Sequence, residues 1–153
     1  MKLQHVKPHG ALYSMAMKDP ALARAIVQGV VAFDPGLIVF AQAKSEMVKA
    51  ASKAGLRVAY EVFSDRAYNR DGSLMSRAAS GAVIEDPKTV TKRAVEMVKN
   101  KRVVAADGKV ADLGEVHTIC VHGDNLKAVA LVKGLRKGLE AEGISVVSVG
   151  NLV

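Results

Sequence analysis

A four-residue run without a polar side chain constrains the fold of this chain more than any other feature. Leu37-Ile38-Val39-Phe40 is apolar at every position, whereas a strand with one solvated face would alternate apolar and polar residues. A strand covered on both faces is typical of a parallel sheet flanked by helices. Before the run, Leu22, Ile26 and Val30 follow one another at helical spacing. The run therefore predicts an α/β fold.

Helix and strand signals alternate along the rest of the chain. Asp19-Pro20 and Asp86-Pro87 each place a capping aspartate before a proline, which is typical of a helix start, and Ser45 is a third N-cap. Residues 64–82 have no clear period and predict a long loop. The expected helices lie within 19–36, 45–55, 86–100 and 128–143, and the expected strands are 3–7, 37–40, 58–62, 102–105, 109–112, 118–121 and 144–149.

Strands that alternate with helices imply βαβ units and a mainly parallel sheet. The chain has 153 residues, a length typical of one domain, so we expect a single α/β domain over residues 1–153. The parallel strands are too few for a closed eight-stranded barrel. Two architectures stay open at this point: an open sheet, or a barrel that lacks its first strands.

Composition narrows the functional classes. The net charge is +7, yet aromatic residues make up only 4% and tryptophan is absent, so stacking surfaces for nucleic acid are scarce and we expect no such partner. No apolar run reaches the length of a membrane span, and the N-terminus lacks a secretory signal, so we expect a cytoplasmic protein. The single cysteine, Cys120, is expected to be a buried small hydrophobe.

Side chains that can do chemistry follow the predicted strands. In parallel α/β folds, ligands bind beyond the carboxyl ends of the strands. The residues found there are Lys7, His9, Gln42, Glu61, Asp65, Arg66, His122 and Asp124. His5 and His117 lie elsewhere on their strands and are expected to be structural. The pattern predicts one reactive rim formed by the loops that follow the strands.

Histidines and a carboxylate at this rim suit acid–base chemistry or metal binding. An imidazole titrates near neutral pH, so His9 and His122 are candidate acids, bases or metal ligands. Asp124 could orient His122, bind a metal together with it, or cap the last helix. These alternatives stay open.

Further charged residues suit anion binding. Glu61 ends an apolar strand, and a buried carboxylate needs a partner such as Lys7 or Arg66. Arg66, Arg70 and Arg77 lie in the long loop, and a guanidinium binds carboxylate or phosphate through two parallel hydrogen bonds. The loop is therefore expected to contribute one or two substrate ligands.

Three stretches of sequence carry a resemblance to a known family. VKPHGALY (6–13), EVFSDRAY (61–68) followed by DGSLMSR (71–77), and TICVHGDN (118–125) resemble the motifs of the LamB/YcsF family, in its order and approximate spacing. The resemblance covers essentially the whole chain. Family members are similar over a further N-terminal stretch with D-L-N-x-D-x-G-E, A-C-G-x-H-x-G and G-A-H-P motifs, none of which occurs here. The chain resembles the C-terminal three-fifths of such a protein.

The resemblance implies a partial, distorted β/α barrel of the glycoside hydrolase and deacetylase type. It implies a hydrolase that opens the lactam of 5-oxo-L-proline to L-glutamate, with ATP as co-substrate and in a complex with two further 5-oxoprolinase subunits. An N-terminal barrel segment is a further expected partner. By motif match, the catalytic residues would be His9, Glu61, His122 and Asp124, and the substrate-binding residues would be Lys7, Asp65, Arg66 and Arg77.

Two rival interpretations belong to other functional classes. One is a metal-dependent, deacetylase-like carbohydrate hydrolase, with a divalent ion bound by His9, His122 and Asp124. The other is an inactive fragment that acts as an interaction module. An open half-barrel would expose strand edges and apolar surface, and would then bind a partner or form a homo-oligomer.

Overall fold

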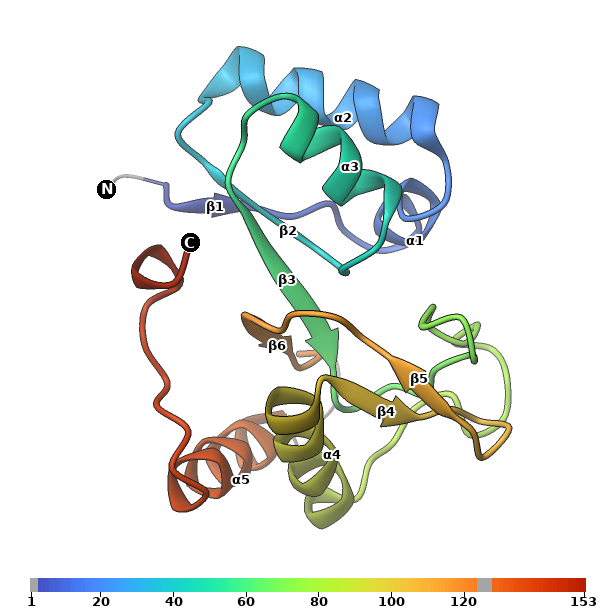
Figure 1. Cartoon of the computed structure of the whole chain (residues 1–153). Helices are drawn as coiled ribbons and strands as arrows, with labels where there is room; N and C mark the ends of the chain where they lie inside the picture. Colours follow the sequence, from blue (N-terminus) through green and yellow to red (C-terminus); the bar gives the residue numbers. More distant parts are fainter. Residues whose placement is uncertain (1–2, 124–127) are drawn as a thin grey trace. The chain divides into compact units, whose positions relative to one another are not determined.

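The computed structural model describes residues 3–123 and 128–153 (Figure 1). By their contacts the residues divide into two compact units. The first unit comprises Met1–Glu61 and Ser148–Val153, and the second unit comprises Val62–Val147. The boundary falls within strand β3 (Val58–Phe63), so one strand contributes to both units. A division by contacts does not decide whether the chain folds as one domain, so the single domain over 1–153 stays a prediction.

The main sheet has four strands in the order β1-β2-β3-β6. β1 (His5–Val6) pairs in parallel with β2 (Ile38–Ala41), and β2 pairs in parallel with β3. β6 (Thr118–Cys120) is the neighbour of β3 on its other side. Helices connect the successive parallel strands. These pairings confirm the predicted fold class, an α/β fold with a mainly parallel sheet.

In the first unit, three helices accompany the strands: α1 (Ala11–Ala16), α2 (Pro20–Phe33) and α3 (Glu46–Lys53). α2 and α3 begin where the sequence predicts, because Asp19 and Ser45 accept hydrogen bonds from backbone amides of the first helical turn. Within the apolar run, Leu37, Ile38 and Val39 are buried and Phe40 is partly buried, as expected of a strand covered on both faces. The sequence pattern gives no signal for α1.

The second unit contains the long loop, two helices and a hairpin. α4 (Pro87–Asn100) starts at the predicted cap Asp86, and β4 (Arg102–Val104) pairs antiparallel with β5 (Val110–Asp112), as predicted. α5 (Ala128–Ala141) packs against α4. Their shared core consists of Ala94, Leu135 and Leu139, surrounded by partly buried Val95, Val98, Ile119, Val121 and Ile144.

Two predictions are wrong. Residues 144–149 form no strand; the segment is irregular and ends in the short 3₁₀ helix η1 (Val149–Asn151). Its valines favour strands, but a strand exists only beside a hydrogen-bonded neighbour, and among the described residues this segment has none. Val146 and Val147 are correspondingly exposed. Cys120 is half-buried rather than buried, as are the other two residues of β6.

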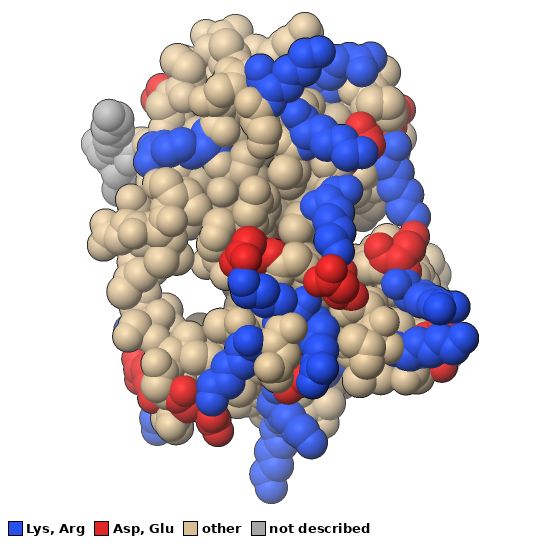
Figure 2. Space-filling view, viewed as in Figure 1, with Lys and Arg blue, Asp and Glu red and all other residues tan. Residues whose placement is uncertain are grey.

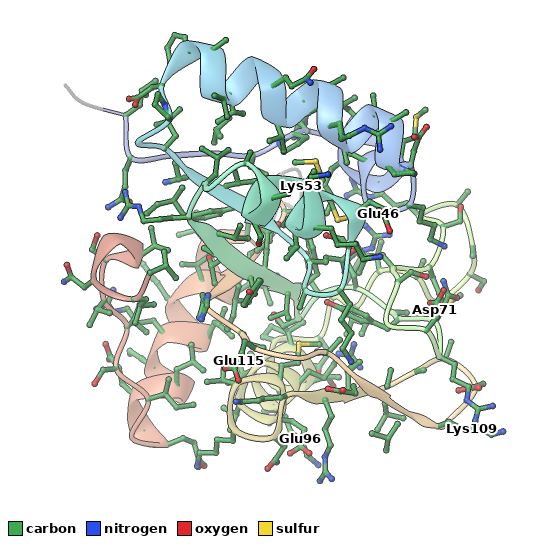
Figure 3. All side chains as sticks on the ribbon, turned by 45° about the horizontal axis from the view of Figure 1, so that its top comes forward. Glu46, Lys53, Asp71, Glu96, Lys109 and Glu115 are labelled. Carbon is green, nitrogen blue, oxygen red and sulfur yellow. The ribbon has the colours of Figure 1, made fainter. Side chains whose placement is uncertain are left out.

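Charged side chains cap the helices and cover the surface. Glu46 lies in the first turn of α3 and Lys53 in its last turn (Figure 3). Both charges interact favourably with the helix dipole, which is positive at the N-terminus and negative at the C-terminus. On the face shown in Figure 2, Lys and Arg side chains are spread among acidic and neutral ones rather than gathered in one block. No helix within residues 3–123 and 128–153 is long and apolar enough to cross a membrane.

Two glycines of α5 test the α4–α5 contact. A Cβ added at Gly138 would lie 2.2 Å from Cγ2 of Thr91 in α4, whereas a Cβ at Gly134 would meet nothing within 4 Å. Gly134→Ala should therefore stabilise the chain by up to about 1 kcal/mol through helix propensity. Gly138→Ala should lose that gain, because Thr91 or the helix must shift. Urea unfolding of both variants measures the difference; equal stabilisation would contradict the tight contact.

Candidate functional site

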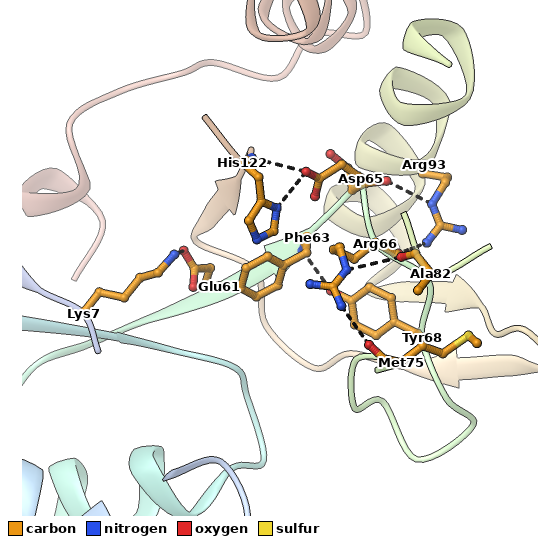
Figure 4. Close-up of polar contacts among 11 residues, drawn as sticks. Lys7, Glu61, Phe63, Asp65, Arg66, Tyr68, Met75, Ala82, Arg93 and His122 are labelled. Carbon is orange, nitrogen blue, oxygen red and sulfur yellow. Dashed lines mark hydrogen bonds and ion pairs between the residues drawn. The ribbon is translucent and has the colours of Figure 1, made fainter. Parts of the chain in front are cut away.

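Lys7 and Glu61 form an ion pair in the first unit. Lys7 Nζ donates a hydrogen bond to Glu61 Oε1 at 2.6 Å (Figure 4). The Glu61 side chain is 3% exposed and that of Lys7 is 26% exposed. Lys7 Nζ also lies 5.4 Å from the centroid of the Tyr13 ring, within the range of a cation–π contact. The prediction that a buried Glu61 takes a basic partner is confirmed, and of the two candidates the partner is Lys7.

Asp65 and His122 form the corresponding pair in the second unit. Asp65 Oδ2 lies 2.8 Å from His122 Nδ1 and also accepts a hydrogen bond from the backbone amide of His122 at 3.2 Å (Figure 4). The Asp65 side chain is 3% exposed and the His122 side chain 25%. The imidazole stacks on Phe63, with ring centroids 5.8 Å apart. Asp65 therefore fixes both the backbone and the ring of His122.

This pairing decides which nitrogen of the imidazole can accept a proton. A carboxylate beside Nδ1 favours the tautomer with the proton on Nδ1, which then donates to Asp65 Oδ2. Nε2 is left with its lone pair. Because His122 is one-quarter exposed, this arrangement suits a general base that is oriented by a buried carboxylate.

The local sequence explains why Asp65 and His122 meet. Each stands two residues beyond the end of its strand, Asp65 after β3 and His122 after β6, and the two strands are neighbours in the sheet. The sequence motifs instead suggest Asp124 as the partner of His122 and a substrate-binding role for Asp65. Asp124 lies outside the described residues, so its role stays a prediction. The equal offset from two strand ends identifies the Asp65–His122 pair only once β3 and β6 are known to be neighbours.

Arg66 serves the loop that follows β3. Its Nε donates to the carbonyl of Ala82 at 3.2 Å and its Nη2 to the carbonyl of Met75 at 2.7 Å. Burial lowers the pKa of the guanidinium from its ordinary value, and the nearby charge of Arg77 acts in the same direction. Arg77 is exposed in this loop. The contacts of Arg66 are those of a loop anchor, and the substrate-binding roles of both arginines stay predictions.

Two residues outside the predicted site set support this region. The Tyr68 hydroxyl, fully buried, accepts a hydrogen bond from the backbone amide of Phe63 at 2.8 Å. Arg93 of α4 donates to the carbonyls of Ser64 and Arg66. Helical periodicity could have identified Arg93, since it follows Val90 by three positions and precedes Met97 by four, and both are buried.

The other predictions for the rim concern His9, the grouping of all these residues on one rim, and a metal site. His9 is exposed in the first unit, between β1 and α1. The structure pairs Lys7 with Glu61 and Asp65 with His122, and whether all of them share one rim stays a prediction. Within residues 3–123 and 128–153, no three His, Cys, Asp or Glu side chains are grouped as metal ligands. The suggested metal set includes Asp124, outside this range, so it too stays a prediction.

The chain is similar in sequence to several known proteins. The chain is 49% identical over 147 residues to the A subunit of 5-oxoprolinase from Pyrococcus horikoshii, covering 96% of this chain and 57% of that protein. It is 48% identical over 153 residues to the protein of the same name from Pyrococcus furiosus, covering 100% and 60%. For the counterpart from Coprothermobacter proteolyticus the identity is 53%, covering 95% and 56%. The chain thus spans less than two thirds of the length of these relatives.

A solved structure supports the same relationship. The crystal structure of a lactam utilization protein from Thermus thermophilus matches with a TM-score of 0.86 at 41% identity, over 95% of this chain and 57% of that chain. The model of the LamB/YcsF family matches residues 1–153. The match to that model along the chain, together with relatives near 50% identity, shows that the chain belongs to the LamB/YcsF family.

Proposed function

We propose that this chain is the larger part of a 5-oxoprolinase A subunit, which opens the lactam of 5-oxo-L-proline to L-glutamate with ATP as co-substrate and two further subunits as partners. The relatives that carry this name are about half identical to the chain. The observation that carries the proposal is the Asp65–His122 pair, a buried carboxylate that orients a partly exposed imidazole. Such a base accelerates the hydrolysis of an amide.

The proposed reaction addresses the low reactivity of a lactam carbonyl. Transfer of the γ-phosphoryl group of ATP to the lactam oxygen turns that oxygen into part of a leaving group. Water adds to the activated carbon and gives up a proton to a base. The C–N bond then breaks as the nitrogen takes up a proton, and a second water hydrolyses the acyl phosphate to the carboxylate and phosphate. The net reaction consumes one ATP and two waters.

His122 is the proposed base. Its Nε2 accepts the proton of the attacking water, and Asp65 stabilises the imidazolium that forms. The Asp65 carboxylate lies in a place with little solvent, where its interaction with a charged ring is stronger than it would be in water. Phe63 packs against the ring and limits its rotation. The imidazole thus stays aligned while its exposed edge remains accessible.

Lys7 is the proposed ligand of an anionic group, either the substrate carboxylate or a phosphate. The pairing with Glu61 holds the Lys7 ammonium in one place, so less side-chain entropy is lost when an anion binds. In the proposal, His9, Glu61 and Asp124 complete the catalytic set, and Arg66 and Arg77 contribute to substrate binding. The chain spans 57% of the length of the relative from Pyrococcus horikoshii, and in the proposal a further, N-terminal barrel segment completes the active protein.

Reconstitution tests the proposed function. Glutamate formation from 5-oxoproline and ATP is measured with this chain and the two partner subunits, with and without an N-terminal segment taken from a relative. Activity in either mixture supports the proposal, and dependence on the added segment shows that the site is shared. Absence of activity in both, beside an active full-length A subunit, would refute it.

Loss of the Asp65–His122 pair should abolish most of this activity. His122→Gln removes the base and Asp65→Asn removes the carboxylate that orients it, so each should reduce kcat by roughly 10²-fold or more. The matched controls are His117→Gln and Asp71→Asn, which change a half-buried histidine just before β6 and an exposed loop aspartate. Steady-state kinetics of the four variants decides. A His122→Gln variant with near-normal kcat would remove His122 from the mechanism.

Loss of Lys7 should destabilise the chain by stranding Glu61. Lys7→Met leaves a carboxylate that is 3% exposed without its cation, at a cost of about 1–3 kcal/mol. Adding Glu61→Gln removes the charge and should recover part of this loss. Lys49→Met, which breaks the exposed pair with Glu46, should cost less than about 1 kcal/mol. Urea unfolding provides the measurement, and strict additivity of the two site variants would contradict the coupling.

A further inference from the structure

Arg93 holds the backbone on both sides of Asp65. Its Nε donates to the carbonyl of Ser64 at 3.1 Å, and its Nη2 donates to the carbonyl of Arg66 at 2.8 Å (Figure 4). Asp65 is the single residue between these two acceptors. A guanidinium is planar and its N–H groups point in fixed directions, so two such bonds fix the spacing and orientation of the backbone between them.

A third hydrogen bond completes the restraint. The amide of Ile84 donates to the carbonyl of Asp65 at 2.8 Å. The carbonyls of three consecutive residues therefore each accept a hydrogen bond, two of them from one side chain. A residue held in this way has little freedom to rotate its backbone, and the direction of its side chain follows from the backbone.

The surroundings of Arg93 affect the pKa of its guanidinium. Burial lowers the pKa of the guanidinium from its ordinary value, while the nearby Tyr68 and Asp65 act in the opposite direction. A half-buried arginine on the inner face of α4 needs acceptors, and it finds them in the segment that carries Asp65. The residue therefore connects α4 to the candidate site.

We propose that Arg93 is a positioning residue, which binds the carbonyls of Ser64 and Arg66 and thereby aims the Asp65 carboxylate at Nδ1 of His122. Its effect on turnover rests on the proposed function, but its effect on the geometry of the pair does not. Arg93 touches neither His122 nor a substrate in this role. It acts through Asp65 alone.

The alternative is an anchor that stabilises the loop without affecting the pair. Arg66 shows what such an anchor looks like, since its two described bonds go to Met75 and Ala82, further along the loop. A test must therefore report on His122 itself as well as on stability. The tautomer of its neutral ring does so, because the proton stays on Nδ1 only while Asp65 accepts it.

The experiment measures the tautomer of His122 by ¹⁵N NMR on the full chain, at a pH at which the imidazole is neutral. Asp65→Ala provides the reference in which the Nδ1–H form loses its acceptor. Arg93→Met should shift His122 toward this reference. Arg93→Lys keeps the charge but cannot bridge both carbonyls in the same geometry, and should lie between. Arg136→Met, which changes an exposed arginine of α5, is the matched control and should leave the tautomer unchanged.

Turnover provides the second readout. In the reconstituted complex, Arg93→Met should reduce kcat by roughly 10- to 10²-fold, as expected for a misaligned catalytic group, with KM little changed. Arg93→Lys should recover part of the loss. Should the wild-type complex be inactive, the proposed function fails while the tautomer still decides the role of Arg93. Folded Arg93→Met or Arg93→Lys chains with the wild-type tautomer would overturn the proposal.

Discussion

The burial of the Asp65 carboxylate is the constraint on which the candidate site of the second unit depends. A charged group with almost no exposure costs several kcal/mol of solvation unless it is hydrogen-bonded and paired. Here the compensation comes from the ring and backbone of His122, while the cation of Arg93 lies close by. Three elements are thereby tied to one group: the end of β3, the residues after β6, and α4. Asp65 therefore holds these elements together in addition to its proposed role beside His122.

The loop after β3 is long without being loosely held. Arg66 and Arg93 are both cations removed in part from solvent, and burial lowers the pKa of each guanidinium from its ordinary value. The acceptors that offset this cost are backbone carbonyls, at Met75 and Ala82 for Arg66 and at Ser64 for Arg93. These hydrogen bonds also determine the path of the loop. A loop built around buried arginines has a defined conformation, which a loop of surface residues would lack.

The sequence predicts features that depend on neighbouring residues and misses those that depend on distant ones. Asp19, Ser45 and Asp86 are predictable as helix caps because a cap binds amides two or three residues away. The identity of the His122 partner depends on β6 lying beside β3, which no local pattern specifies. The wrongly predicted strand at 144–149 has the same cause, because its valines are suited to a strand but the described part of the fold supplies no partner.

The Lys7–Glu61 ion pair and the hydrogen-bonded Asp65–His122 pair divide their tasks in the same way. In each, the carboxylate is buried and its basic partner, Lys7 or His122, is about one-quarter exposed. A buried acid cannot reach a substrate without moving, whereas its partner can. The acid therefore acts by fixing the position of the partner, and in the proposed catalytic set Glu61 acts by orienting Lys7. In both pairs the partly exposed partner is the group that can contact a substrate, and the buried carboxylate holds that partner in place.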